Sequence, residues 1–155
     1  MTILNVAAYR FVRIDDAADL AVRLRERLAA QGLRGSVLLA PEGINAFLAG
    51  EPQTLRAAVR ELMTDKRFAD LSCKWSESSA MPFRKLLVKC KREIIRFDRP
   101  EIDPAAGRAP SVDPITLQRW LAQGRDDSGR ELALLDTRNQ QEVAHGTFTG
   151  ALTLP

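Results

Sequence analysis

Residues 38–50 read LLAPEGINAFLAG, two apolar runs joined by a short Pro-Glu-Gly insert. A phosphate-binding loop needs several glycines and a Lys-Ser/Thr ending at a helix N-terminus, so that backbone N–H groups point at the anion. Here apolar residues follow Gly43, which favours a β-hairpin with Glu42-Gly43 at its tip. The stretch therefore predicts two paired strands, over about residues 34–40 and 43–49.

The segments on either side of this hairpin alternate between strand and helix patterns. Residues 3–12 are rich in β-forming side chains and predict a strand. Apolar residues recur at helical spacing over 17–28 and over 55–63. A short strand is predicted over 71–75 and a longer one over 83–97, with a bulge near its C-terminal end where the apolar residues change face. The order β-α-β-β-α-β with an added strand predicts an α+β, ferredoxin-like sandwich, with two helices on one face of an antiparallel sheet.

The remainder of the chain predicts a linker and a second, smaller segment. Residues 98–113 are proline-rich with few large apolar side chains, which separates a domain over 1–97 from a segment over 114–155. That segment predicts a helix over 114–122 and a buried strand over 132–135. Roughly 40 residues of this kind are too few for a full core, so we expect them to be disordered or sheltered by self-association. Its apolar side chains expected to be exposed are Leu132, Leu134, Leu135 and Phe148.

Composition limits the class of protein. With 155 residues and 45% hydrophobic side chains, the chain can form one ordinary globular core. No apolar run approaches the roughly 18 residues that span a bilayer, and the N-terminus lacks the basic start and apolar stretch of a signal peptide. Two cysteines are too few for a disulfide framework. We therefore expect a cytoplasmic protein that does not contact membranes.

Positive charge is concentrated in one segment. Residues 71–97 carry seven basic and two acidic side chains. This is the footprint expected for a polyanion, although a solvated strand face would give the same pattern. Trp75 and Phe83 are nearby aromatics, but the sequence shows no cluster of aromatics on the central strands, so phosphate contacts are favoured over base reading. The candidate RNA-binding residues are Lys74, Arg84, Lys85, Lys89, Lys91 and Arg92.

Few residues point to catalysis. The only histidine is His145, so neither cysteine has an obvious general base. Cys90 is expected to be a buried small hydrophobe, whereas Cys73, beside Lys74, is a candidate for a lowered thiol pKa. The cysteine and histidine count falls short of a zinc site. The loop after the first strand contains Asp15 and Asp16 but no glycine, which argues against acylphosphatase activity.

Three stretches together resemble the family of rhodanese-domain proteins described as tRNA uridine(34) hydroxylases. They are GSVLLAPEGINAFLAG over 35–50, MPFRKLLVKCKREIIRF over 81–97 and LLDTRNQQEVAHGTFTGAL over 134–152. The resemblance implies an N-terminal acylphosphatase-like (ferredoxin-like) domain followed by a rhodanese domain. It also implies an oxygen-dependent reaction that forms 5-hydroxyuridine at the wobble position, with molecular oxygen as co-substrate, and tRNA, through its anticodon stem-loop, as partner. No other cofactor is identifiable, and no metal site is expected.

The same resemblance places the rhodanese nucleophile, a cysteine, beyond Pro155. Asp136, Arg138 and Glu142 match the early rhodanese motif, where the resemblance implies a structural role. We therefore expect the C-terminal segment to be an incomplete α/β rhodanese-like piece and the chain to be inactive alone. A fragment of a longer enzyme is favoured over a truncated gene product. A rhodanese-type sulfurtransferase and a non-catalytic protein-interaction module remain the alternatives.

Overall fold

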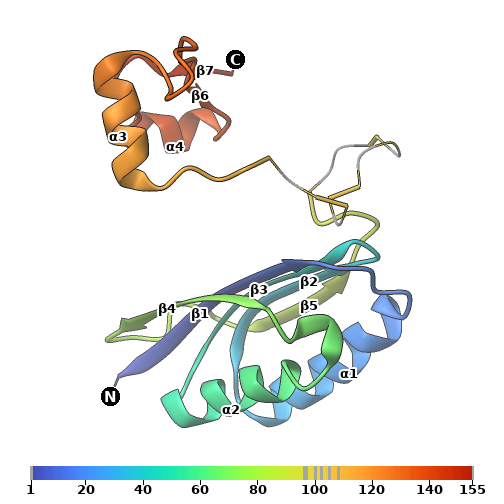
Figure 1. Cartoon of the computed structure of the whole chain (residues 1–155). Helices are drawn as coiled ribbons and strands as arrows, with labels where there is room; N and C mark the ends of the chain where they lie inside the picture. The colour runs from blue at the N-terminus through green and yellow to red at the C-terminus, as the bar shows by residue number, and fades with distance from the viewer. Residues whose placement is uncertain are drawn as a thin grey trace. The chain divides into compact units, whose positions relative to one another are not determined.

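A computed structural model of the chain describes residues 2–95, 98, 99, 101, 103, 104, 106, 107 and 109–154. The chain divides into two compact units, residues 1–108 and 109–155, and each is described by itself. Figure 1 shows both units, coloured along the chain. No helix in the described residues has the length and apolar character required to cross a bilayer.

The first unit contains a five-stranded sheet in the order β4-β1-β3-β2-β5 (Figure 1). All neighbouring strands are antiparallel except β2 and β5, which are parallel. The predicted ferredoxin-like arrangement is confirmed, and the added strand makes the sheet mixed rather than purely antiparallel. The elements are β1 (Ile3–Phe11), α1 (Ala17–Ala30), β2 (Arg34–Ala40), β3 (Gly43–Gly50), α2 (Pro52–Leu62), the 3-10 turn η1 (Lys66–Phe68), β4 (Ser72–Ser78) and β5 (Leu86–Cys90).

The stretch LLAPEGINAFLAG is the hairpin of β2 and β3, as predicted. Ala40 pairs with Gly43, so the two-residue loop is Pro41-Glu42 rather than a tip at Glu42-Gly43. Gly43 has a φ of 151°, and a Cβ there would lie 2.1 Å from the carbonyl oxygen of Arg10. The close approach of β1 therefore requires glycine at this position.

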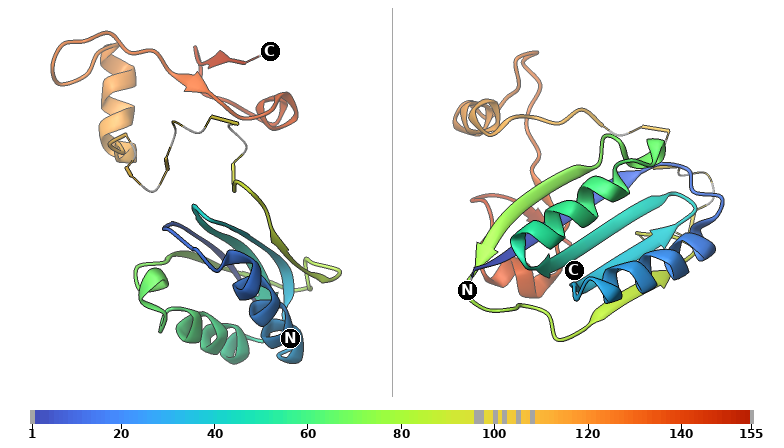
Figure 2. Two further views of the ribbon diagram at one scale, coloured as in Figure 1. Left: turned by 90° about the vertical axis from the view of Figure 1, so that its right-hand side faces the viewer. Right: turned by 90° about the horizontal axis from the view of Figure 1, so that it is seen from below.

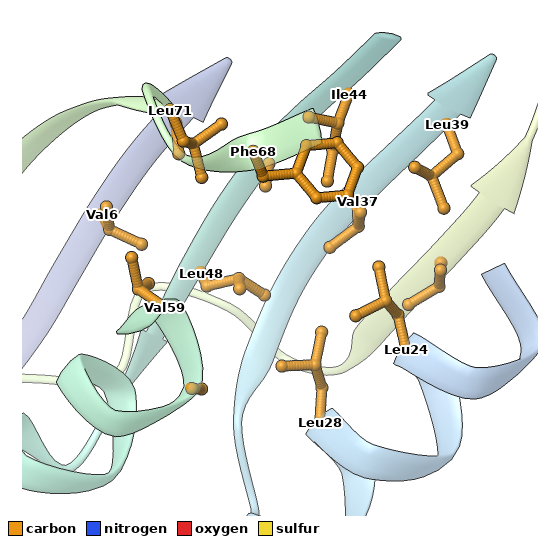
Figure 3. Close-up of a cluster of buried hydrophobic side chains, with 14 of the residues drawn as sticks. Val6, Leu24, Leu28, Val37, Leu39, Ile44, Leu48, Val59, Phe68 and Leu71 are labelled. Carbon is orange, nitrogen blue, oxygen red and sulfur yellow. The ribbon is translucent and has the colours of Figure 1, made fainter. Parts of the chain in front are cut away.

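Both helices cover the same face of the sheet (Figure 2). Leu24 and Leu28 of α1 and Val59 of α2 point toward this face and contact a layer of apolar side chains from the strands (Figure 3). Phe68 from η1 is fully buried beside Ile44 of β3. Alternation along each strand thus builds a one-sided core, because every second residue faces the helices.

The edge strand β5 is shorter than the predicted strand over residues 83–97. Its partner β2 ends at Ala40, where the hairpin loop begins, and only Lys91 continues the pairing, with its N–H donating to the carbonyl oxygen of Leu39 at 2.8 Å. The N–H of Ile94 instead donates to the carboxylate of Glu42 at 2.6 Å. The predicted bulge is wrong for the described residues, because the chain leaves the sheet before the apolar residues change face. Phe97 lies outside the described residues.

The second unit contains α3 (Pro114–Gln123), β6 (Leu135–Asp136), α4 (Gln140–Ala144) and β7 (Leu152–Thr153). The predicted helix over 114–122 is confirmed, and the Asp113 carboxylate caps it by accepting from the N–H groups of Ile115 and Thr116, each at 3.0 Å. The predicted buried strand over 132–135 is wrong: β6 has two residues, and Leu135 is exposed. No side chain described in 109–154 is buried.

Candidate nucleic-acid interface

All six candidate RNA-binding residues have exposed side chains. They do not form one strand, because Lys74 lies on β4 and Lys89 on β5, the two opposite edges of the sheet. Register places both on the face without helices, with Lys74 opposite Ala7 and Lys89 opposite Leu38. In the chain, β5 is flanked by Arg84 and Lys85 on one side and by Lys91 and Arg92 on the other. The basic residues therefore follow the β5 edge of the sheet, and Lys74 alone lies at the opposite edge.

The two aromatics noted in the sequence do not lie with these lysines on the sheet. Trp75 has the opposite parity to Lys74 and faces the helices, where the guanidinium of Arg56 in α2 lies 5.0 Å from its ring centroid. Phe83 is half-buried and precedes β5. Trp75 therefore does not lie beside the basic residues on the helix-free face.

Two aromatics that were not predicted from the sequence occupy this face. Tyr9 of β1 and Phe47 of β3 are 42% and 44% exposed, and they lie on the two neighbouring strands in the middle of the sheet. Phe11 shares the face and is half-buried. The expectation that the central strands lack clustered aromatics is therefore wrong. The sequence did contain the signal. Tyr9 is three residues from Val6 and Phe47 is next to Leu48, so strand alternation places each ring on the face opposite to a core residue.

We call this helix-free surface the open face. It is formed by every second residue of β1–β5, and none of these strand residues is acidic. Its buried side chains are the small ones of Ala40 and Ala49. The residues that alternation and register place on it are Ile3, Asn5, Ala7, Tyr9, Phe11, Arg34, Ser36, Leu38, Ala40, Asn45, Phe47, Ala49, Ser72, Lys74, Ser76, Ser78, Leu87 and Lys89.

Neither cysteine fits its predicted state. Burial raises the pKa of the Cys73 thiol, because desolvation disfavours the thiolate, so the suggested lowering by Lys74 is wrong. Cys90 is exposed rather than buried, since it is the last residue of β5, which is an edge strand with a neighbour on one side only. In the described residues no group of three or more histidine, cysteine or acidic side chains is arranged to hold a metal ion.

The loop between β1 and α1 is occupied by ion pairs. Hydrogen bonds from Arg67 and Arg23 lower the pKa of Asp16 to about 2, so its carboxylate stays charged near neutral pH. Arg13 pairs with Asp15 at 2.8 Å. Because two carboxylates already accept from the nearby guanidinium groups, this loop offers little to a phosphate, in agreement with the argument against acylphosphatase chemistry.

In the second unit, Asp136 connects β6 to the turn after α4. Its carboxylate accepts from the guanidinium of Arg138 at 2.6 Å and from the hydroxyl of Thr147 at 2.7 Å, and these bonds lower its pKa. Arg138 also donates to the carbonyl oxygen of Gly146 at 2.8 Å. Glu142 forms a capping box with Asn139 at the start of α4. These contacts are internal to the unit and assign no catalytic role to the three motif residues.

Comparison with known families agrees with the fold. The family described as "UPF0176 acylphosphatase like domain" matches residues 3–94, and the chain belongs to this family. A solved structure, "BlrP1 BLUF", aligns with a TM-score of 0.51 at 16% identity, over 84% of this chain and 95% of that one. At this identity the likeness shows the fold alone.

The curated relatives carry a more particular name. Proteins named "tRNA uridine(34) hydroxylase" from Variovorax paradoxus, Bordetella pertussis and Xanthomonas euvesicatoria are 63%, 61% and 54% identical to this chain over 97%, 97% and 99% of its length. The alignment covers 57%, 62% and 62% of those proteins. The chain therefore spans less than two thirds of the length of the relatives it matches.

Proposed function

We propose that this chain is the N-terminal part of an enzyme that hydroxylates uridine 34 of tRNA to 5-hydroxyuridine in an oxygen-dependent reaction. The observation that carries the proposal is the identity of 63% to a protein named tRNA uridine(34) hydroxylase over 97% of the chain. In this proposal residues 98–113 link the sheet domain to a rhodanese-like segment. The protein works in the cytoplasm, and its catalytic residue belongs to a part of the enzyme outside residues 1–155.

The role that we propose for the sheet domain is to hold the anticodon stem-loop through phosphate contacts. Support comes from the exposed cations at the edges of the open face and from the lack of acidic residues among its strand positions. Cations in this setting attract a polyanion without reading its bases. Lys74, Arg84, Lys85, Lys89, Lys91 and Arg92 are the contacts.

A complementation experiment tests the enzymatic proposal. A strain lacking its tRNA uridine(34) hydroxylase receives either the full-length Variovorax paradoxus relative or residues 1–155, and its tRNA nucleosides are quantified by mass spectrometry. We expect the relative to restore 5-hydroxyuridine and residues 1–155 to fail. Restoration by residues 1–155 would contradict the proposed division of labour and direct attention to Cys73 and Cys90. Failure of both would contradict the proposed reaction.

Charge reversal tests the tRNA-positioning role. Lys89→Glu with Lys91→Glu is compared with Arg60→Glu and Lys66→Glu, a pair with the same change in charge on α2 and η1. Each lost phosphate contact should reduce the slope of log K against log salt by roughly 0.7–0.9. Equal effects of the two pairs on tRNA affinity would show that net charge, not this edge of the sheet, is responsible.

Exposed apolar side chains support a second proposal, self-association through the second unit. Leu135, Phe148 and Leu152 are 50%, 55% and 59% exposed. Sedimentation of the chain and of Phe148→Ser tests it: a dimer that the substitution dissociates supports the proposal, and a monomer at all concentrations contradicts it.

A further inference from the structure

The open face presents two aromatic rings at its centre. Ala7 pairs with Phe47 and Tyr9 pairs with Asn45, so Tyr9 and Phe47 are diagonal neighbours across the β1–β3 ladder. Diagonal side chains on one face lie roughly 7–8 Å apart, within reach of each other's rings. The two strands therefore hold the rings side by side in fixed positions, on regular backbone rather than on loops.

These rings are not needed for the core of the domain. The core lies on the other face, where Leu48 is 4% exposed and Val6 is 3% exposed. Leu38 and Leu87 extend the apolar surface from β3 toward the β5 edge, and Leu87 is 39% exposed. Single exposed apolar residues are ordinary, whereas apolar side chains that gather over adjacent strands are a feature of binding surfaces.

The charges around the apolar side chains of the open face indicate the chemistry of the partner. Lys74 lies on one edge strand and Lys89 on the other, and Arg34 begins β2 on the same face. Serine and asparagine fill much of the remaining strand surface, and no strand residue on this face is acidic. Aromatic rings between cations suit a single-stranded nucleic acid, since bases stack on the rings while phosphates contact the cations.

A cleft of about 500 Å³ continues the face beyond Tyr9, and Phe11, Ser72 and Pro104 are among its lining residues. Its volume falls in the range of roughly 300–1,000 Å³ that is typical of small-molecule sites. Its acidic side chain, Asp70, is ion-paired with Arg10 at 3.2 Å. The cleft therefore adds apolar surface next to the Tyr9 ring, together with the Arg10–Asp70 ion pair, whose carboxylate is largely exposed.

We infer that the open face binds unpaired RNA bases, which stack on Tyr9 and Phe47 while Arg34, Lys74 and Lys89 contact the phosphates. This inference rests on the proposed tRNA-positioning role and refines it: the sheet domain holds a single-stranded stretch of the RNA, not only its backbone charge. Duplex RNA is a poor ligand for this face because its bases are already stacked and paired.

Affinity measurements with ring-deleting variants test the inference. Binding of an oligouridylate to the 155-residue chain is compared among Tyr9→Ala, Phe47→Ala, Tyr9→Phe and Trp75→Ala. Each lost stacking ring should weaken binding by about 5-fold to 150-fold, whereas Tyr9→Phe, which keeps the ring, should bind as tightly as the unchanged chain. Trp75→Ala is the matched control, because it removes an aromatic from the opposite face of the same sheet. An equal loss in Trp75→Ala would overturn the inference.

The salt dependence separates the stacking inference from the proposed phosphate contacts. Phe47→Ala should leave the slope of log K against log salt unchanged, whereas Lys89→Ala should reduce it by roughly 0.7 for a single strand. If Lys89→Ala weakens binding and the ring variants do not, stacking is wrong and the tRNA-positioning role stands. If neither RNA nor oligouridylate binds the chain at all, both are wrong.

Tyr9 is the only tyrosine in the chain, so 3-fluorotyrosine gives a single fluorine resonance from this ring. Addition of oligouridylate should move that resonance through the ring current of a stacked base, and addition of duplex RNA should move it much less. Equal shifts with both ligands would overturn the preference for unpaired bases. A shift that depends on protein concentration without RNA would instead assign the open face to a second copy of the chain.

Discussion

The two faces of the sheet are built from the same strands and differ in their exposure to solvent. In β3, Ile44 is 1% exposed and faces α1 and α2, while Phe47 is 44% exposed on the open face. The face that packs against α1 and α2, here called the covered face, has apolar residues because they form the core. The open face carries apolar rings that no helix of the first unit covers in the described residues. Stability accounts for the first set of residues, and the inferred stacking of RNA bases would account for the second.

The largest expected effect compares two phenylalanines. Phe68→Ala removes a fully buried ring from the covered side and should lower the free energy of unfolding by about 3–5 kcal/mol. Phe47→Ala removes a ring that is half in solvent, and should lower it by about 1 kcal/mol or less. Urea unfolding followed by Trp75 fluorescence, in a Trp120→Phe background, measures the sheet domain alone. Similar losses in both variants would mean that the open face is covered in solution.

The second prediction concerns the hairpin that joins β2 and β3, two strands with residues on both faces. Gly43→Ala should destabilise the domain by roughly 1–3 kcal/mol, because it combines a φ of 151° with a Cβ placed 2.1 Å from the Arg10 carbonyl oxygen. Gly107→Ala is a matched control, since Gly107 has the same φ and no atom within 4 Å of a built Cβ. The difference in unfolding free energy between the variants isolates the close approach of β1. No difference would mean that the hairpin moves away from β1 at little cost.

The third prediction concerns the edge strand that carries Lys89. The guanidinium of Arg25 in α1 donates to the carbonyl oxygen of Val88 at 2.6 Å, which ties the helical layer to β5. Arg25→Ala should cost about 0.5–1.5 kcal/mol and speed hydrogen exchange at the Lys91 amide, which pairs with β2. Arg60→Ala, an exposed arginine of α2, is the control. Unchanged exchange at Lys91 in Arg25→Ala would contradict the proposed tie.

Particular residues show how far the sequence alone determines this architecture. The apolar spacing of Leu20, Leu24 and Leu28 and the Pro-Glu-Gly insert over 41–43 locate α1 and the hairpin, because both depend on local periodicity and turn chemistry. The length of β5 depends on where its partner β2 ends, which is information from elsewhere in the chain. Tyr9 and Phe47 are far apart in sequence, and only the register of β1 on β3 brings them together.

The same distinction between local sequence patterns and information from elsewhere in the chain applies to the candidate site residues. Exposure of the six cations could be predicted from their charge, whereas the placement of Lys74 and Lys89 at opposite edges of the sheet required the strand order. Trp75 and Lys74 are adjacent in sequence and lie on opposite faces, since alternation separates neighbours. The burial of Cys90 was predicted from its parity alone, and parity does not reveal that Cys90 ends an edge strand of the sheet.

The smallest expected effect concerns an ion pair at the margin of the covered face. Asp16, just before α1, accepts from Arg67 of η1 and from Arg23 of α1, and its pKa in the folded chain falls from 3.8 to about 2. A lowered folded pKa means that the carboxylate stabilises the fold above about pH 4, and that this contribution is lost as the pH falls toward about 2. The side chain of Asp16 is 38% exposed, so solvent and salt limit the effect to about 1 kcal/mol or less. Asp16→Asn should therefore lower the thermal midpoint slightly near neutral pH, and its difference from the unchanged chain should shrink to nothing near pH 2.

The control for this pH dependence is Asp19→Asn, which removes an exposed carboxylate from the first turn of the same helix. Added salt should reduce the effect of Asp16→Asn, because screening weakens a pair that is open to solvent. If the difference between Asp16→Asn and the unchanged chain is constant from about pH 2 to 6, the loss comes from packing rather than charge. In that outcome the charge of Asp16 does not help to hold the helical layer on the covered face, and the contrast with the charged, aromatic open face becomes sharper.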